Sequence, residues 1–198
     1  MPLELFLAQV VFASVMAFTP GPNNVLLTAS GVNFGFMRTM PHMVGVTIGF
    51  DVLLVAGAVG VGLLFSAVPQ LQLVLKVGGA LYMLYLAFKV ATAHHGGGEG
   101  DAPARPFTFL QAAAFQWINP KALLAVVGGV ALYVRPGHEW IDFPVMLVVM
   151  TAATIGAVTL WTGFGVALRR FLRDPARARI FNVAMALLLV ASIVPMVL

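Results

Sequence analysis

Two short polar segments interrupt hydrophobic stretches of this chain and contain residue types that could bind a small charged molecule. The first is Thr19-Pro20-Gly21-Pro22-Asn23-Asn24, and the second is Gln116-Trp117-Ile118-Asn119-Pro120-Lys121. Proline has no amide hydrogen and blocks the carbonyl group one helical turn earlier, so each segment should break a helix and leave backbone groups unpaired. Inside a membrane such groups are tolerated only where protein, water or a ligand pairs with them.

The backbone of these two breaks suits a zwitterion. Thr19 or Gly21 can cap a new half-helix that begins at the next proline, and Asn119 can do the same before Pro120. A half-helix N-terminus offers free amides and about half a positive charge, which suits a carboxylate, whereas carbonyl groups freed upstream suit an ammonium group. Four side-chain amides would add directional hydrogen bonds: Asn23, Asn24, Gln116 and Asn119. The alternative is that the prolines only kink the two helices.

Three ionisable side chains are expected inside apolar stretches, namely Asp51, Lys76 and Lys121. A charge that is unpaired there is costly, so pairing or access to water is expected. Asp51 could carry the coupling proton of an antiporter, with Lys121 as its partner or as a contact for a substrate carboxylate. The alternative is a static ion pair that holds helices together. Lys76 is close enough to a predicted helix end to extend its ammonium group into water.

The composition identifies the class of protein that must position these residues. The 198 residues are 61% hydrophobic and 9% charged, whereas soluble domains carry about 25% charged residues. Six apolar stretches are long enough for a membrane span of about 20 helical residues, and they cover 5–30, 41–65, 70–92, 107–134, 143–168 and 178–197. We therefore expect an all-α integral membrane fold of six transmembrane helices, the first and fourth broken. No basic region precedes the first stretch, so we expect it to be retained rather than cleaved as a signal peptide.

The two breaks also divide the chain into halves. Pro120 lies 98 residues after Pro22, about half the length of the chain. We expect a single transmembrane domain over 1–198, made of one repeat over 1–93, a cytoplasmic linker over 94–106 and a second repeat over 107–198. Because each half has three helices, the second must enter the membrane from the opposite side. This predicts an inverted-topology repeat, an arrangement common in secondary transporters.

The distribution of basic residues predicts the orientation. Eight of them lie in or beside one set of loops, namely Arg38, Lys89, Arg105, Arg169, Arg170, Arg173, Arg177 and Arg179, whereas the opposite set has only Arg135. The positive-inside rule places the basic loops in the cytoplasm. Both termini are then expected outside the cytoplasm. Anionic lipid headgroups are the expected partners of the arginines from Arg169 to Arg179, and no binding of nucleic acid is expected.

Several chemistries are disfavoured by the residues themselves. The chain has no cysteine, which excludes disulfides, thiolate metal sites and cysteine nucleophiles. We expect no metal site and no cofactor, because the four histidines, His42, His94, His95 and His138, fall at or outside predicted helix ends. An intramembrane aspartyl protease needs two aspartates, and only Asp51 is expected within the membrane. A serine protease needs a Ser–His pair deep in a span, which this placement of the histidines does not provide, so no enzyme is expected.

At this point the motifs together resemble those of the LysE/RhtB family. The resemblance rests on the first break, on Gly45-Val46-Thr47-Ile48-Gly49-Phe50-Asp51, on the segment from Lys76 to Ala87, and on Asn119-Pro120-Lys121-Ala122. It implies an inner-membrane exporter of amino acids or close derivatives, driven by proton entry. The last apolar stretch is similar to the cysteine/O-acetylserine branch, although the segments with Asp51 and Lys76 are similar to the homoserine/threonine branch. The resemblance therefore leaves the substrate open.

Our leading hypothesis is a secondary transporter that exports small amino acids by alternating access, with the substrate bound between the two breaks. The main alternative is a non-transporting membrane scaffold or assembly protein. A stripe of Gly45, Gly49 and Gly60 permits close helix packing. This stripe could form the interface of a homodimer or could pack within one chain, and the sequence does not separate the two.

Overall fold

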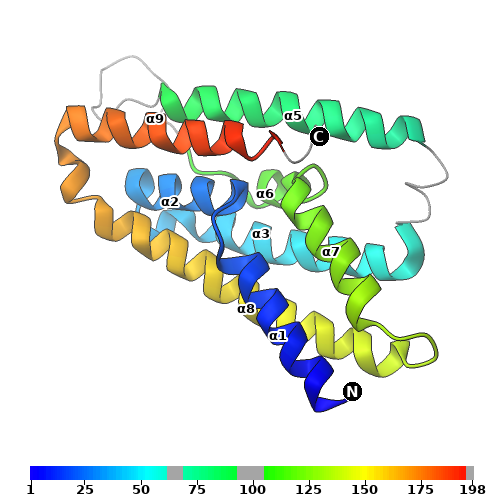
Figure 1. Ribbon diagram of the computed structural model, residues 1–198. Coiled ribbons are helices and arrows are strands. Elements are labelled where there is room, and N and C mark those ends of the chain that lie inside the picture. Colours follow the sequence, from blue (N-terminus) through cyan, green and yellow to red (C-terminus); the bar gives the residue numbers. More distant parts are fainter. Residues whose placement is uncertain (62–68, 93–104, 195–198) are drawn as a thin grey trace.

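The computed structural model describes residues 1–61, 69–92 and 105–194, and it gives only the backbone of Val61, residues 69–76 and Arg173. These residues form eight α-helices, a π-helical turn and a 3-10 turn (Figure 1). In chain order they are α1 (Leu3–Phe18), α2 (Pro22–Phe34), α3 (Phe36–Ala56), the π turn (Gly57–Val61), α5 (Pro69–Ala91), α6 (Phe109–Phe115), α7 (Pro120–Tyr133), α8 (Glu139–Leu168), the 3-10 turn (Phe171–Arg173) and α9 (Pro175–Ala191). The expected linker segment 94–104 and the side chain of Lys76 lie outside the described residues.

The predicted breaks in the first and fourth apolar stretches are confirmed. The α1 and α2 axes differ by 52°, and the α6 and α7 axes by 60°. In the described parts of the chain, α3 and α8 are long and apolar enough to cross a membrane, and each bent pair meets the same test when counted as one broken span. Length and composition thus identify two to four candidate spans. The predicted all-helical membrane fold is confirmed at this level.

Local chemistry explains where each break falls. At the first, α1 ends at Phe18, and α2 begins with Pro22 after the extended residue Gly21. At the second, a turn follows α6, and Asn119 and Pro120 begin α7. Proline is well suited to the first helical position because its missing amide hydrogen would be unpaired there in any case.

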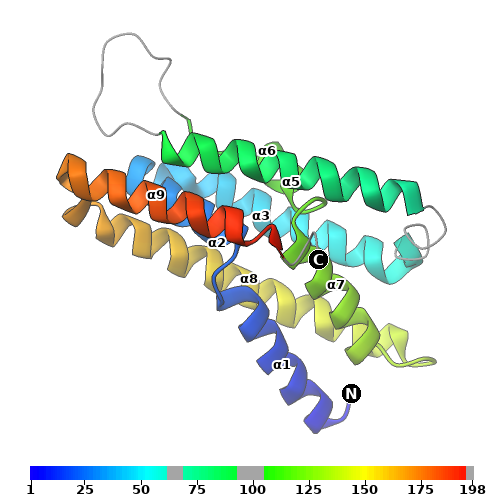
Figure 2. The ribbon, with the colours of Figure 1, turned by 45° about the horizontal axis from the view of Figure 1, so that its top comes forward.

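The helices pack as layers on either side of the two breaks. Helices α5 and α9 run antiparallel along one side of the molecule (Figures 1 and 2). Beneath them α2 packs on α8, and α3 packs on both α6 and α8. From their breaks, α1 and α7 lead away from the α5–α9 layer toward the end of the molecule that carries the N-terminus (Figure 1).

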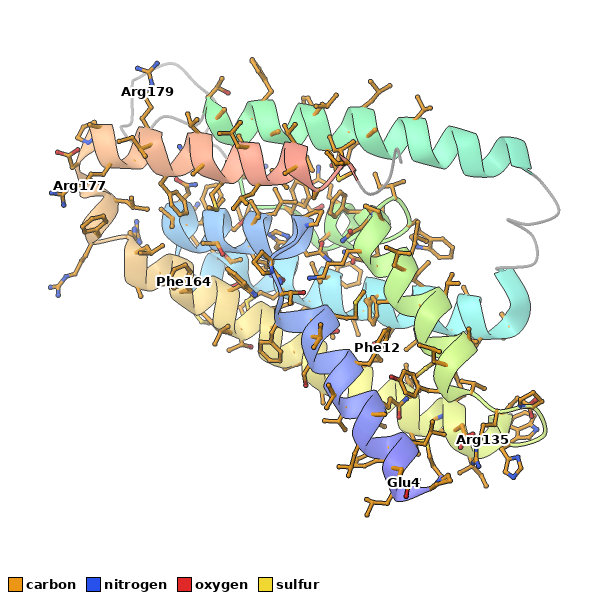
Figure 3. All side chains as sticks on the ribbon, viewed as in Figure 1. Glu4, Phe12, Arg135, Phe164, Arg177 and Arg179 are labelled. Atoms are coloured by element: carbon orange, nitrogen blue, oxygen red, sulfur yellow. The ribbon has the colours of Figure 1, made fainter. Side chains whose placement is uncertain are left out.

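Charged side chains separate toward opposite ends of this bundle. Arg177 and Arg179 lie at the end where α8 leads into α9, whereas Arg135 and Glu4 lie at the opposite end (Figure 3). The turn between α2 and α3, which precedes Arg38, is at the same end as Arg177. The structure thus agrees with the predicted separation of basic loops.

Glycines permit close contacts between two pairs of helices within the chain, α2 with α8 and α3 with α6. Gly31 of α2 faces the backbone of Thr162 in α8, and Gly165 of α8 faces the backbone of Thr28 in α2. Gly45 and Gly49 of α3 face the backbone of α6. Two of the three stripe glycines therefore pack inside one chain, and the third, Gly60, lies in the π turn with φ 96°.

A pair of substitutions in α8 tests these contacts. Gly165→Ala would push a methyl group against the backbone of Thr28 and should destabilise the protein by about 1–3 kcal/mol. Gly163→Ala in the same helix meets open space and should be neutral or stabilise by up to about 1 kcal/mol through helix propensity. Thermal unfolding in detergent measures both, and equal midpoints for the two variants would contradict the packing.

Candidate functional site

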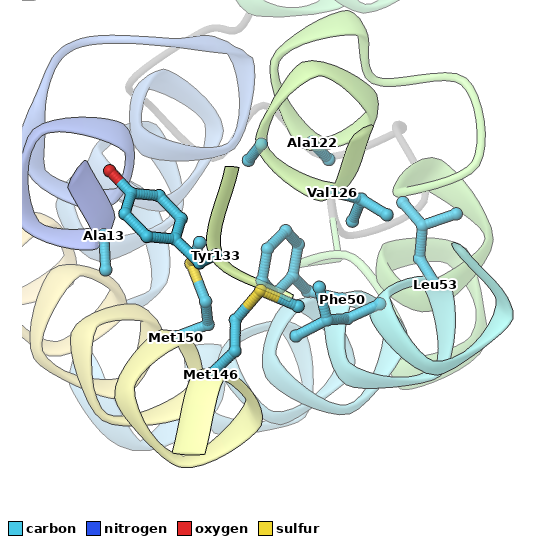
Figure 4. Close-up of a cluster of buried hydrophobic side chains, with 10 residues drawn as sticks. Ala13, Phe50, Leu53, Ala122, Val126, Tyr133, Met146 and Met150 are labelled. Atoms are coloured by element: carbon cyan, nitrogen blue, oxygen red, sulfur yellow. The ribbon is translucent and has the colours of Figure 1, made fainter. Parts of the chain in front are cut away.

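The two breaks border one pocket with a polar side and an apolar side. It has about 560 Å³ of open space, part of which is continuous with solvent. The polar side consists of Thr154 of α8 and of residues of the breaks, namely Gly21, Asn23, Asn24, Gln116, Asn119 and Lys121. Ala13, Phe50, Ala122 and Met150 form part of the apolar side and belong to the hydrophobic cluster shared by α1, α3, α7 and α8 (Figure 4). A pocket of this kind suits a small molecule with both charged and apolar parts.

The carbonyl groups at the α1–α2 break are paired with donors of the protein itself. Asn24 Nδ2 donates to the carbonyl oxygens of Ala17, at 2.9 Å, and of Thr19, at 2.8 Å. Lys121 Nζ donates to the carbonyl oxygen and to Oγ1 of Thr19, the latter at 2.9 Å, and it lies 3.4 Å from the carbonyl oxygen of Pro20. A cation is thus bound where the sequence predicts that an ammonium group could bind.

The two half-helix N-termini differ in how they are capped. At α2, Gly21 is the cap and no side chain bonds the first amides. At α7, the side chain of Asn119 accepts a hydrogen bond from the amide of Lys121 at 3.1 Å. Of the two caps predicted for the first break, Gly21 is correct and Thr19 is wrong, because α2 begins at Pro22, directly after Gly21. The amide end of α2 is therefore better placed than that of α7 to bind an anion.

A reciprocal pair of hydrogen bonds joins the breaks. Asn23 Nδ2 donates to Gln116 Oε1 at 2.8 Å, and Gln116 Nε2 lies 3.2 Å from Asn23 Oδ1. Gln116 is fully buried and also donates to the carbonyl oxygen of Ala112 at 2.8 Å. The structure thus brings together segments that are 93 residues apart, as the sequence predicted.

The predicted pairing of Asp51 with Lys121 is not found. Asp51 Oδ1 instead accepts a hydrogen bond from Thr151 Oγ1 of α8 at 2.8 Å. Within the described residues the ion pair is Arg135–Asp142, at 2.7 Å between Nε and Oδ2, and sequence reasoning missed it. Opposite charges seven residues apart across the turn between α7 and α8 were the available signal.

The expectation that all four histidines lie at or outside helix ends is wrong for His42. Gly35, with φ 79°, ends α2 sharply, and α3 then begins at Phe36 and continues through Pro41. His42 is consequently buried, with Nδ1 3.2 Å from Ser30 Oγ. No carboxylate in the described part of the chain bonds His42, so the Ser–His–carboxylate arrangement of a serine hydrolase is incomplete.

The other histidines give no metal site within the described residues. His138 is exposed and caps α8, as expected for a residue at a helix end. His94 and His95 lie outside the described residues.

Sequence reasoning also missed Gln9 of α1. Its side chain is fully buried, and neither Oε1 nor Nε2 has a hydrogen-bond partner in the part of the chain that the structure describes. Gln9 lies one helical turn before Ala13, which lines the pocket. A single glutamine in an apolar stretch was the available signal.

The Asn23–Gln116 pair yields a test of how the breaks are held together. Asn23→Leu or Gln116→Leu alone leaves the partner amide unpaired and should destabilise the protein by about 1–3 kcal/mol. The double variant removes both amides and should be less destabilised than the sum of the single changes. Thermal unfolding of the four proteins measures this coupling, and additive effects would show that the pair contributes nothing.

Comparison with known proteins identifies relatives of this chain. Residues 14–193 match the family model described as LysE type translocator. Curated relatives include cysteine/O-acetylserine efflux proteins of Escherichia coli (strain K12), Escherichia coli O9:H4 (strain HS) and Shigella flexneri serotype 5b (strain 8401). Each is 31% identical over 184 residues, which cover 90% of this chain and 90% of the relative. No solved structure matches the chain significantly. The chain therefore belongs to the LysE type translocator family, whose members are membrane transporters rather than enzymes.

Proposed function

We propose that this protein is a secondary transporter that exports small amino acids or their derivatives from the cytoplasm by proton antiport. The observation that carries the proposal is the α1–α2 break, which presents both backbone carbonyl groups and uncapped amides beside one pocket. Three relatives that cover most of the chain are named as cysteine/O-acetylserine efflux proteins. Cysteine and O-acetylserine are therefore the first substrates to test.

The chemistry of the pocket supports this substrate class. The carbonyl groups of Thr19 and Pro20 suit the ammonium group of an amino acid, and the first amides of α2 suit its carboxylate. Among the described residues that line the pocket, Lys121 is the ionisable one, and the other side chains are amide, apolar or, at Thr154, hydroxyl. An uncharged substrate side chain, such as a thiol or an acetyl ester, fits against Met150 and Ala122 without an unpaired charge.

The packing supports six spans arranged as an inverted repeat. In this arrangement α5 and α9 are the remaining spans, and α1, α2, α3 and α5 correspond to α6, α7, α8 and α9. The packing of α3 on α6 then corresponds to that of α8 on α1, and both contacts occur. When the two halves are exchanged, α5 and α9 change places and α3 and α8 change places, so the α5–α9 and α3–α8 contacts are each mapped onto themselves. Such symmetry is the usual basis of alternating access.

We place the arginine-rich end of the bundle in the cytoplasm and both termini in the periplasm, because basic loops favour the inner side. The side chains of four arginines there are described and exposed, namely Arg169, Arg170, Arg177 and Arg179. Together with Arg173, they are the proposed contacts for anionic lipid headgroups. A homodimer is proposed to use other surfaces than Gly45 and Gly49, because α6 covers these glycines.

For the coupling proton, the candidate groups are Asp51, Lys121 and Lys76. Lys121 lines the pocket, and Asp51 directly follows Phe50, which also lines it. The hydrogen bond from Thr151 gives Asp51 a second possible role, as a link between α3 and α8.

Counterflow in proteoliposomes tests transport directly. Vesicles loaded with unlabelled O-acetyl-L-serine or L-cysteine should take up the labelled amino acid faster than empty vesicles, because exchange needs only the loaded carrier. Vesicles that lack the protein are the control. The absence of exchange across a broad amino-acid panel would reject transport and favour a scaffold or assembly protein.

Asp51→Asn tests proton coupling. The amide still accepts a hydrogen bond from Thr151 but cannot take up a proton. If Asp51 carries the coupling proton, proton-driven accumulation is lost while counterflow stays measurable; if Lys121 carries it, both persist. Thr151→Val is the matched control, because it removes the hydrogen bond and keeps the carboxyl group. If Asp51→Asn lowers only the thermal unfolding midpoint, Asp51 has a structural role.

A further inference from the structure

The position that suits the ammonium group of a substrate is already filled by the ammonium group of Lys121. Its Nζ contacts three oxygens of the first break, namely the carbonyl oxygens of Thr19 and Pro20 and Oγ1 of Thr19. An amino-acid ammonium group has the same charge and the same number of donors as a lysine ammonium group. Lys121 therefore places in this position the same chemical group that an amino-acid substrate carries on its α-carbon.

This arrangement depends on residues from both halves of the chain. Lys121 is the second residue of α7, and Asn119 fixes its backbone amide by capping that helix. From there the lysine stem crosses Gly21, at which a Cβ atom would lie only 2.7 Å from Lys121 Cδ and 3.2 Å from Nζ. The backbone of Gly21 is extended, so the reason for glycine here is space for the lysine rather than an unusual φ angle.

We propose that Lys121 is an internal occupant of the substrate's ammonium site, that an amino acid must displace it in order to bind, and that the displaced Lys121 releases one proton to water. This inference rests on the proposed function and deepens it by assigning the chemical step that links substrate to proton.

Displacement leads to proton release because the pocket offers the lysine no second partner of opposite charge. Among the described residues that line the pocket, which come from α1, α2, α3, α7, α8 and the two breaks, none has a carboxylate side chain. The carboxylate of Asp51 in α3 directly follows the lining residue Phe50, and it accepts a hydrogen bond from Thr151. The carboxylate of the substrate is held by the amides of α2. A displaced lysine ammonium group would face the ammonium group of the substrate without a carboxylate side chain beside it, and repulsion between the like charges favours the neutral amine.

The exchange balances as a cycle. On the cytoplasmic side, the zwitterionic amino acid enters, its ammonium group takes the oxygens of Thr19 and Pro20, and Lys121 gives one proton to water. On the periplasmic side the amino acid leaves, Lys121 takes up one proton, and the lysine ammonium group returns to the same oxygens. In each cycle one substrate moves outward and one proton moves inward. During the return step the ammonium group of Lys121 occupies the site that the substrate has left.

Proton release upon binding tests this inference. Purified protein in weakly buffered detergent solution near neutral pH is titrated with O-acetyl-L-serine, or with whichever panel amino acid exchanges fastest, and a pH dye and calorimetry report protons and binding. Wild type should release about one proton per amino acid bound, and its apparent Kd should fall roughly tenfold for each unit rise in pH. Lys121→Met keeps the stem over Gly21 but should release almost no proton per amino acid bound. Lys89→Met is the matched control, because Lys89 lies over the Tyr85 ring outside the pocket, and it should behave as wild type.

The outcomes separate this inference from the proposed function. If wild type exchanges amino acids but binds them without proton release, the inference is wrong and the transport function stands. Proton release that survives in Lys121→Met and disappears in Asp51→Asn assigns the proton to Asp51 and also overturns it. If Lys121→Met does not bind, the pH dependence of wild-type binding decides, and a Kd that is independent of pH overturns the inference. Wild type that exchanges no amino acid overturns both proposals.

Discussion

The pairing of backbone groups at the α1–α2 break is the constraint on which the rest of the structure depends. Carbonyl groups that lose their helical partners in a membrane need other donors. Here the donors are Asn24 from the next turn and Lys121 from the other half of the chain. Because Lys121 has to reach across, α7 must begin beside the first break, and Gly21 must leave room for the lysine stem.

The two breaks are related but not equivalent. Each has a proline at the first position of its second half-helix, and the Asn23–Gln116 pair joins them. At the second break, however, Asn119 satisfies the helix end with its own side chain, whereas the end of α2 has no side-chain cap. The first break is therefore the open half of the pair, and the second supplies the lysine and the support.

The sequence was sufficient to predict the features that depend on local rules. Pro22 and Pro120 identified both breaks, because proline is well suited to the first position of a new helix, and the basic residues near Arg177 identified one end of the bundle. The spatial partners of polar side chains could not be predicted in this way. Whether Lys121 bonds to Asp51 or to Thr19 depends on how α7 crosses α1, and no spacing in the sequence encodes that crossing. His42 was misplaced because a helix that begins directly after Gly35 and continues through Pro41 conflicts with the usual effect of proline.

The contact between α2 and α8 has a mechanical consequence. Gly31 lies in the last turn of α2 and Gly165 in the last turn of α8, and at both positions the backbone of one helix meets that of the other. A barrier made of side chains can open by a change of rotamer, but a barrier made of two touching backbones cannot. Any route between α2 and α8 at these positions therefore requires whole helices to separate, so the movement that admits a solute there is a rigid-body displacement rather than the swing of a single gate residue.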